Sequence, residues 1–329
     1  MAELTYGKAI GRAIAEEMRR DPDVFVMGEN VGTTGNIFKV LEGLLAEFGE
    51  ERVRDTPLAE EIIINAAVGS AMAGLRPVAE IMYVDFTTFG LDALLNQASK
   101  SWFNSAGRVN CPMVLRCPQG AGPGRGSHHT NSLEAWFAHV PGLKVVLPAT
   151  PADAKGLMVS AIRDDNPVVF LEHKQLYFTK GEVPDGEYSI PLGKADVKRA
   201  GKDLTIVCYS ITVHTALKAA ELLRKEGIEA EVLDLRCLMP LDREAVLASV
   251  AKTRRAMVLY EAPVHYGAGG EIVTLIQQEL FRDLRAPVRR IGGLHTHIAY
   301  APNLCAAAVP TVEQVAAAAR DLVGYKRKA

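Results

Sequence analysis

The feature that most constrains the fold is the alternation of short apolar runs with longer stretches of helical period. Apolar runs of strand length recur through the first part of the chain, and a helical stretch separates each from the next. Parallel strands need such crossovers, and the helices then cover both faces of the sheet. The chain is therefore predicted to be an α/β protein with parallel sheets. The strands expected in this part are 24–27, 76–82, 112–116, 143–147 and 167–171, and the expected helices include 38–48, 91–106 and 151–163. In the second part of the chain, strands are expected at 204–208, 231–235 and 256–260.

Length and a break in the pattern indicate two domains. A chain of 329 residues is long for one ordinary domain. Glycine and proline interrupt every period between Gly181 and Leu192, and the strand and helix pattern restarts at 204–208. We predict one domain over 1–185, a second over 196–329, and a linker at about 181–195.

Composition excludes several classes of function. The net charge is -2 and there is no long basic block, so neither nucleic acid nor an anionic membrane surface is an expected partner. No apolar run approaches the roughly 18 residues of a membrane span, and the first residues lack a signal-peptide pattern. The five cysteines are scattered without a Cys-x-x-Cys pair, which is typical of reduced thiols in a cytoplasmic protein.

Two acids, Glu60 and Glu61, open a strongly apolar helical stretch that ends near Ala73. A helix that is apolar on most sides is expected to be buried. Acids in a first helical turn suit the helix dipole, which is the simpler interpretation. The alternative is that one carboxylate is carried inward, desolvated and available for proton chemistry.

Histidines mark two further candidate sites. A glycine-rich loop, 119–127, ends at His128 and His129. Its glycine spacing fits neither a dinucleotide fingerprint nor a P-loop, so a closing loop is the better interpretation. Either histidine could act as an acid or base near pH 7, or simply be solvated. His295 and His297 have the spacing of metal ligands, but no third ligand lies near them in the sequence.

The stretch 161–167 closes a predicted helix with Asp164, Asn166 and Pro167. An ordinary C-terminal cap with a proline stop explains it. Freed backbone carbonyls together with Asp and Asn oxygens would equally suit a monovalent cation.

Taken together and in order, several stretches resemble the beta subunit of the thiamine-diphosphate-dependent first component (E1) of 2-oxo acid dehydrogenase complexes. This family includes pyruvate, branched-chain 2-oxo acid and acetoin dehydrogenases, and the resemblance runs along essentially the whole chain. It implies an N-terminal pyrimidine-type thiamine-diphosphate domain followed by a C-terminal transketolase-like domain. The matching stretches are 28–32, 54–60, 68–77, 139–146, 153–157 and 161–167.

The resemblance also implies roles for single residues. Glu60 would hydrogen-bond the aminopyrimidine of the cofactor and favour its imino tautomer, which activates the thiazolium carbon for attack on the substrate keto carbon. Phe86 would stack on the aminopyrimidine, with Met82 at the same strand end. His129 would act near the substrate and the lipoyl group, while His128 is unusual for the family. The implied potassium ligands are Met113, Ala161, Ile162, Asp164 and Asn166.

An absent motif predicts a partner. Thiamine enzymes hold the diphosphate and Mg²⁺ with a Gly-Asp-Gly motif, and this sequence contains none. The diphosphate half of the site is therefore expected from an alpha subunit in an alpha-2-beta-2 heterotetramer. The second domain would serve assembly and docking to the lipoyl acyltransferase (E2) core.

The sequence departs from the family at Ala59, Ala93 and 295–298, which leaves the substrate open between a small 2-oxo acid and acetoin. A split transketolase-like subunit and a non-catalytic assembly or docking subunit are the alternatives. A flavodoxin-like nucleotide binder ranks last because no phosphate loop is present.

Overall fold

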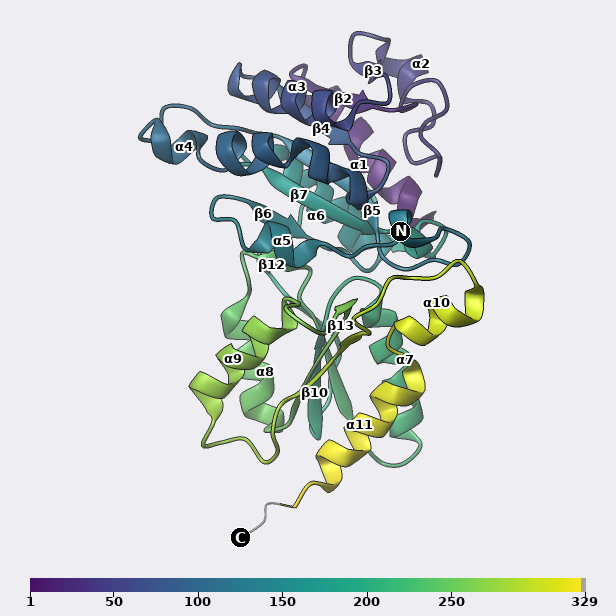
Figure 1. Cartoon of the computed structure of the whole chain (residues 1–329), viewed down its shortest axis with the longest axis vertical. Helices are drawn as coiled ribbons and strands as arrows, with labels where there is room; N and C mark the ends of the chain where they lie inside the picture. Colours follow the sequence, from purple (N-terminus) through teal and green to yellow (C-terminus); the bar gives the residue numbers. More distant parts are fainter. Residues whose placement is uncertain (327–329) are drawn as a thin grey trace. The chain divides into compact units, whose positions relative to one another are not determined.

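A computed structural model describes residues 1–326 (Figure 1). The chain forms two compact units, which are treated separately below. The first comprises 1–119 and 136–192, and the second comprises 120–135 and the chain from Gly193 onward. The glycine-rich loop therefore groups with the second unit, although it lies between strands of the first.

A parallel sheet forms the centre of the first unit, as the alternating pattern predicts. Within this unit the strand order is β6-β7-β5-β4-β2-β3. A separate antiparallel pair, β1 (Ala2–Thr5) with β8 (Lys180–Val183), was not expected from the sequence. The bounds of the sheet strands are β2 (Val24–Gly28), β3 (Val53–Asp55), β4 (Arg76–Glu80), β5 (Val114–Gln119), β6 (Lys144–Val146) and β7 (Val168–His173).

Helices cover both faces of this sheet. The connection from β3 to β4 crosses the sheet in the opposite direction to the one from β6 to β7. Crossovers between parallel strands are right-handed as a rule, which places α3 and α6 on opposite faces. The helix α1 packs beside α6. The helical segments are α1 (Tyr6–Arg20), α2 (Leu44–Phe48), α3 (Glu60–Met72), η1 (Val84–Gly90), η2 (Ala93–Ala98), α4 (Ser101–Asn104), α5 (Glu134–Ala138), α6 (Pro151–Arg163) and η4 (Lys174–Leu176).

Two helix predictions and one prediction of burial in this unit were wrong. The helix expected over 38–48 is reduced to α2, because Gly43 adopts a left-handed φ of 90° that a helix cannot continue through. The helix expected over 91–106 is divided into the π-helix η2 and the short α4. The helix α3 is not buried on all sides in this chain, because Ile62 keeps 64% of its surface exposed.

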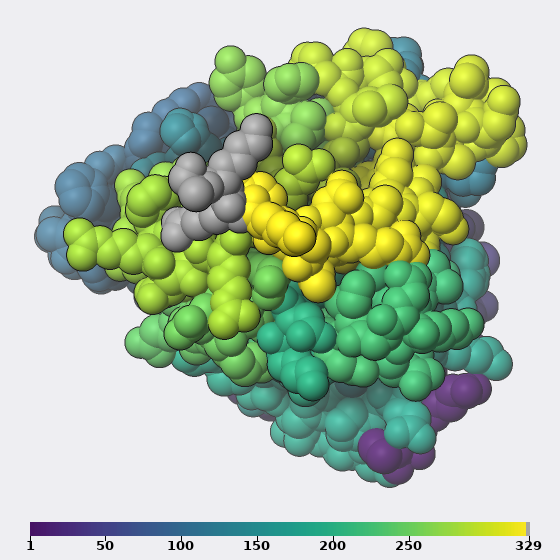
Figure 2. All heavy atoms as spheres, turned by 90° about the horizontal axis from the view of Figure 1, so that it is seen from below, coloured from purple at the N-terminus to yellow at the C-terminus, as the bar shows by residue number. Residues whose placement is uncertain are grey.

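The second unit is a smaller α/β domain around a five-stranded sheet of order β14-β13-β10-β11-β9. Its strands are parallel except for the edge strand β9. Figure 2 shows α11 packed beside α7 on this unit. Its elements are η3 (Ser127–His129), β9 (Asp196–Arg199), β10 (Leu204–Cys208), α7 (Thr212–Arg224), β11 (Ala230–Asp234), β12 (Cys237–Met239), α8 (Arg243–Thr253), β13 (Ala256–Pro263), α9 (Gly269–Leu280), β14 (Arg289–Gly293), α10 (Pro302–Ala308) and α11 (Val312–Gly324).

Candidate active site

Acidic residues gather where the direction of the first sheet reverses. From β2 the chain adds β3 on one side and β4 on the other, so a switch point lies at the carboxyl ends of β2 and β4. Open α/β sheets bind ligands at this place. Glu29 directly follows β2, Glu80 ends β4, and Glu60 begins α3 after β3. The sheet order thus brings three carboxylates from distant parts of the sequence to one edge.

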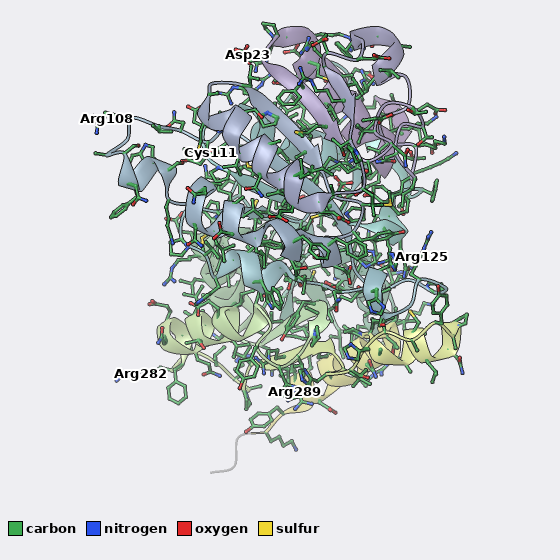
Figure 3. All side chains as sticks on the ribbon, turned by 45° about the horizontal axis from the view of Figure 1, so that its top comes forward. Asp23, Arg108, Cys111, Arg125, Arg282 and Arg289 are labelled. Carbon is green, nitrogen blue, oxygen red and sulfur yellow. The ribbon has the colours of Figure 1, made fainter. Side chains whose placement is uncertain are left out.

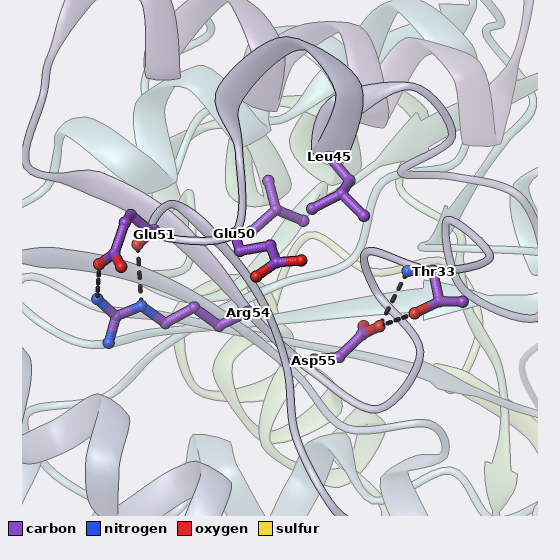
Figure 4. A pocket seen from close by; sticks show the side chains of 7 residues that line it. Thr33, Leu45, Glu50, Glu51, Arg54 and Asp55 are labelled. Atoms are coloured by element: carbon purple, nitrogen blue, oxygen red, sulfur yellow. Dashed lines mark hydrogen bonds and ion pairs between the residues drawn. The ribbon is translucent and has the colours of Figure 1, made fainter.

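Asp55, at the end of β3, fixes the turn that follows Glu29 (Figure 4). Its carboxylate accepts hydrogen bonds from the backbone N–H groups of Gly32 at 2.7 Å and Thr33 at 2.9 Å, and from the Thr33 hydroxyl. Burial raises the pKa of Asp55, but these hydrogen bonds outweigh it and hold the pKa below its ordinary value. Asp55 is therefore an anchor for the turn. It also borders a polar surface hollow lined by Thr33, Leu45, Glu50, Glu51, Val53, Arg54 and Asp55.

Glu29 is a buried carboxylate in an unfavourable environment. The residue is only 5% exposed, and neither carboxylate oxygen has a hydrogen-bond partner among the described residues. Burial raises the pKa of Glu29, and the nearby Glu60 and Glu80 carboxylates raise it further. Glu29 consequently holds a proton more readily than an ordinary glutamate. Its burial was not expected from the sequence, where 28–32 belongs to the stretches that resemble the family.

Glu60 stands in the first turn of α3 and is half-buried. Ala59, which precedes the helix, offers no side-chain cap, so the N-terminus of α3 is open. Glu61 beside it is exposed. The two acids thus differ in this chain, and Glu60 is the one within electrostatic range of Glu29.

The predicted cofactor contacts Met82 and Phe86 follow β4 and are both half-buried. Phe86 lies in η1, which packs against α3. The segments η1 and α3 approach each other closely. A Cβ atom on Gly90, at the end of η1, would come within 2.5 Å of the Ile64 side chain in α3. The structure therefore brings the segment of Met82 and Phe86 beside the helix that Glu60 begins.

A buried network of charges lies below this edge. Arg116 of β5 is fully buried and binds Glu172 of β7 through two hydrogen bonds of 2.7 and 2.5 Å. It also forms an ion pair with Glu80 of β4. Burial by itself lowers the pKa of Arg116, but the two carboxylates outweigh it and raise the pKa, so the guanidinium stays charged. Asn36 donates to Glu80 at 2.9 Å and Tyr177 donates to Glu172 at 2.6 Å.

The loop histidines belong to the second unit. His128 and His129 lie in η3, where His128 is exposed and His129 is half-buried. The His128 Nδ1 atom lies 3.3 Å from the Ser127 hydroxyl. His129 therefore comes from a different compact unit than Glu60, Met82 and Phe86.

The expected potassium ligands surround the C-terminus of α6, but cationic side chains already contact them. Arg76 Nη1 donates to the carbonyl oxygens of Ile162 at 3.0 Å and Asp164 at 3.2 Å, and Lys144 pairs with the Asp164 carboxylate. The other carbonyls accept backbone hydrogen bonds, Met113 from Val168 and Ala161 from Asp164. Asn166 turns back to the Asp164 carboxylate. Because these oxygens already accept hydrogen bonds or an ion pair, they do not favour a further cation. The potassium site stays a prediction.

Other metal and membrane possibilities find no support in residues 1–326. No group of three or more His, Cys, Asp and Glu residues there could hold a metal ion, so the spacing of His295 and His297 does not form such a site. The His295 ring instead packs edge-on against the His265 ring, with 5.0 Å between the ring centroids. No helix of the same residues is long and apolar enough to cross a membrane.

Comparisons with known proteins agree with this architecture. The transketolase pyrimidine-binding domain matches residues 2–180, and the transketolase C-terminal domain matches residues 193–315. A solved split-gene transketolase, described as an inactive beta4 tetramer, has a TM-score of 0.81 and covers 98% of this chain and 99% of its own. At 23% identity, this likeness shows the fold alone.

Several characterised relatives match along nearly their whole length. The 2-oxoisovalerate dehydrogenase subunit beta of Bacillus subtilis is 43% identical over 99% of this chain and 100% of the relative. A pyruvate dehydrogenase E1 component subunit beta-2 of Oryza sativa is 46% identical over 97% of this chain and 86% of its own. The acetoin:2,6-dichlorophenolindophenol oxidoreductase subunit beta of Cupriavidus necator is 43% identical over 97% of each chain.

Proposed function

Since this chain belongs to the family of beta subunits of the E1 components of 2-oxo acid and acetoin dehydrogenases, we propose that it forms half of a thiamine-diphosphate active site. The complete site decarboxylates a 2-oxo acid or cleaves acetoin, and it passes the acyl group to a lipoyl carrier. The observation that carries the proposal is the switch-point edge, where Glu60 lies within electrostatic range of Glu29 and beside the segment of Phe86.

The residues present fit the pyrimidine half of the cofactor. When bound, thiamine diphosphate supplies a nucleophilic carbon and an electron sink for the carbon next to a keto group. Phe86 offers an aromatic face and Met82 an apolar contact for a flat ring. Glu60 would hold the pyrimidine ring by a hydrogen bond to one of its nitrogen atoms, and such a bond is stronger where water is excluded.

The environment of Glu29 supports this role of Glu60. Two ionised carboxylates in a water-poor site repel each other, so one of them tends to keep a proton. Burial and the Glu60 carboxylate both raise the pKa of Glu29, so the site disfavours a second negative charge beside Glu60. Arg116 and its partners Glu80 and Glu172 keep the strand ends beneath the site in place.

The other half of the site comes from an alpha subunit. The sequence has no Gly-Asp-Gly motif, so the diphosphate and Mg²⁺ are held by that subunit, in an alpha-2-beta-2 assembly that docks on a lipoyl acyltransferase core. The exposed apolar face of α3 is where we place the contact with alpha, since an apolar patch of this kind requires cover. We place the assembly in the cytoplasm, in keeping with five buried cysteines that are scattered along the sequence without a Cys-x-x-Cys pair.

The test is a titration with thiamine diphosphate and Mg²⁺ of this chain alone and of its mixture with the alpha subunit. Tight binding and turnover are expected only in the mixture. Glu60→Gln should lower turnover roughly 100- to 10,000-fold, the range for loss of an acid–base group. Glu61→Gln is the matched control. Glu61 is next to Glu60 in the sequence but is exposed, so this variant should behave as wild type.

Other outcomes would reject parts of the proposal. Tight cofactor binding by the chain alone would contradict the half-site. Full activity of Glu60→Gln in the mixture would favour a non-catalytic assembly role. Turnover that ignores lipoyl acceptors but transfers two-carbon units would favour a split transketolase.

A further inference from the structure

The loop that carries His128 and His129 is fastened at its base to the second sheet. The Gly120 N–H donates to the Asn131 carbonyl at 2.9 Å and closes the loop. The next amide, that of Ala121, donates at 2.6 Å to the carboxylate of Glu261 in β13, a residue 140 positions away in the sequence. Hydrogen bonds between an N–H and a charged carboxylate are stronger than neutral ones. Ala121 itself is only 2% exposed.

A second attachment lies at the tip of the loop. The Gly124 N–H donates to the Tyr300 carbonyl at 3.1 Å. Gly126 has a φ of +71°, and a Cβ atom there would come within 2.5 Å of the Tyr300 ring. The Tyr300 ring therefore lies directly against the backbone of Gly126. Tyr300 keeps 68% of its surface exposed, and the loop covers part of the remainder.

The loop between the two attachments is internally braced. The hydroxyl of Thr130, a residue only 3% exposed, donates to the Gly126 carbonyl at 2.7 Å. This bond spans the segment that contains both histidines. By contrast, Arg125 at the tip is exposed and points away from the ribbon (Figure 3). The backbone of the loop is therefore held by hydrogen bonds, while the Arg125 side chain is directed outward.

We propose that Glu261 and Tyr300 are positioning residues that hold the loop in the conformation in which His129 serves acyl transfer to the lipoyl group, an inference that rests on the proposed function. Neither residue touches the reacting atoms. They act through the backbone of Ala121, Gly124 and Gly126. Prepositioning matters because a displacement of about 1 Å in a catalytic group can reduce the rate about 100-fold.

The first measurement is hydrogen exchange at the amides of Ala121 and Gly124, in the full chain assembled with its alpha subunit. Glu261→Ala and Tyr300→Ala should each increase exchange about tenfold or more, as expected when about 1.4 kcal/mol of local protection is lost. Glu261→Gln keeps an oxygen acceptor and should show a smaller increase. Tyr300→Phe keeps the ring and the carbonyl and is the matched control, with wild-type exchange.

The second measurement separates lipoyl transfer from the earlier chemistry. Glu261→Ala should lower kcat for the lipoyl substrate roughly 10- to 100-fold. It should leave KM for the small substrate, and turnover with an artificial electron acceptor, near wild type. In a His129→Ala background the effect of Glu261→Ala on lipoyl transfer should disappear, because both changes remove the same contribution.

A steric variant tests the Tyr300 contact separately. Gly126→Ala should loosen the loop because the new methyl group meets the Tyr300 ring, and Gly126→Ala with Tyr300→Ala should remove the clash but retain the backbone strain. Unchanged exchange in Glu261→Ala and Tyr300→Ala would overturn the inference. So would an undiminished Glu261→Ala effect in the His129→Ala background. If the wild-type assembly has no thiamine-dependent turnover, the proposed function fails, and the exchange measurements alone still decide whether these residues hold the loop.

Discussion

The Glu29 carboxylate is placed where its charge is disfavoured, and this makes the stability of the chain depend on pH in a defined direction. The folded state raises the pKa of Glu29 above its ordinary value of 4.5, chiefly through burial. Stability linked to this group is therefore fully present below about pH 4.5 and is lost as the pH rises through the folded-state pKa. Glu29→Gln, which cannot ionise, should stabilise the chain by about 1–3 kcal/mol at pH 7.5.

Thermal unfolding of wild type and Glu29→Gln at pH 7.5 and pH 4 measures this effect. The two chains should differ at pH 7.5 and converge at pH 4. Glu61→Gln is the control, because Glu61 is exposed and should show no difference at either pH. A stabilisation by Glu29→Gln that persists unchanged at pH 4 would mean that packing, and not charge, is responsible.

Three neighbouring strands depend on one buried arginine. Arg116 in β5 faces Glu80 in β4 and Glu172 in β7, so it neutralises two carboxylates that would otherwise repel each other in a dry interior. Arg116→Met keeps most of the side-chain volume but leaves both carboxylates uncompensated. We expect it to lower the free energy of unfolding by about 3–5 kcal/mol, measured by urea denaturation followed by circular dichroism.

Two further variants separate the charge effect from a packing effect. Adding Glu80→Gln and Glu172→Gln to Arg116→Met should restore most of the stability, since replacing a whole buried ion group is often nearly neutral. Arg19→Met breaks the exposed pair with Glu47 and should leave the free energy of unfolding nearly unchanged. A triple variant as unstable as Arg116→Met would place the loss in packing.

The proposed contact with the alpha subunit uses a surface that the single chain leaves uncovered. Ile62 on α3 is 64% exposed, and Ala66 and Gly69 extend the same exposed face. If this face contacts the alpha subunit, Ile62→Asp should abolish the stable complex while the isolated chain keeps its unfolding midpoint. Analytical ultracentrifugation of the mixture measures the complex. Phe281→Asp in the second unit is the matched control with the same 64% exposure, and it should leave association with alpha intact. Normal assembly of Ile62→Asp would place the alpha contact elsewhere.

Local sequence was enough to predict most of the regular elements. Apolar runs gave β2, β5, β7, β10 and β13 their positions, because only strands covered on both faces are apolar throughout. The helix α6 begins at the predicted Pro151, since Thr150 caps it by accepting from the Asp153 N–H at 3.2 Å. The order of motifs also identified the family, and the two transketolase domains match this expectation.

Tertiary structure decided what those elements do together. Glu29, Glu80 and Arg116 are each ordinary in the sequence, and their burial and pairing follow from which strands become neighbours in the sheet. The loop of His129 lies between two strands of the first unit but is held by Glu261 and Tyr300 of the second. Periodicity describes each segment against its own axis, so it predicted most of the strands and helices, and the order of the motifs identified the family. Only the contacts between distant segments determined which carboxylates lose water and which unit holds the histidine loop.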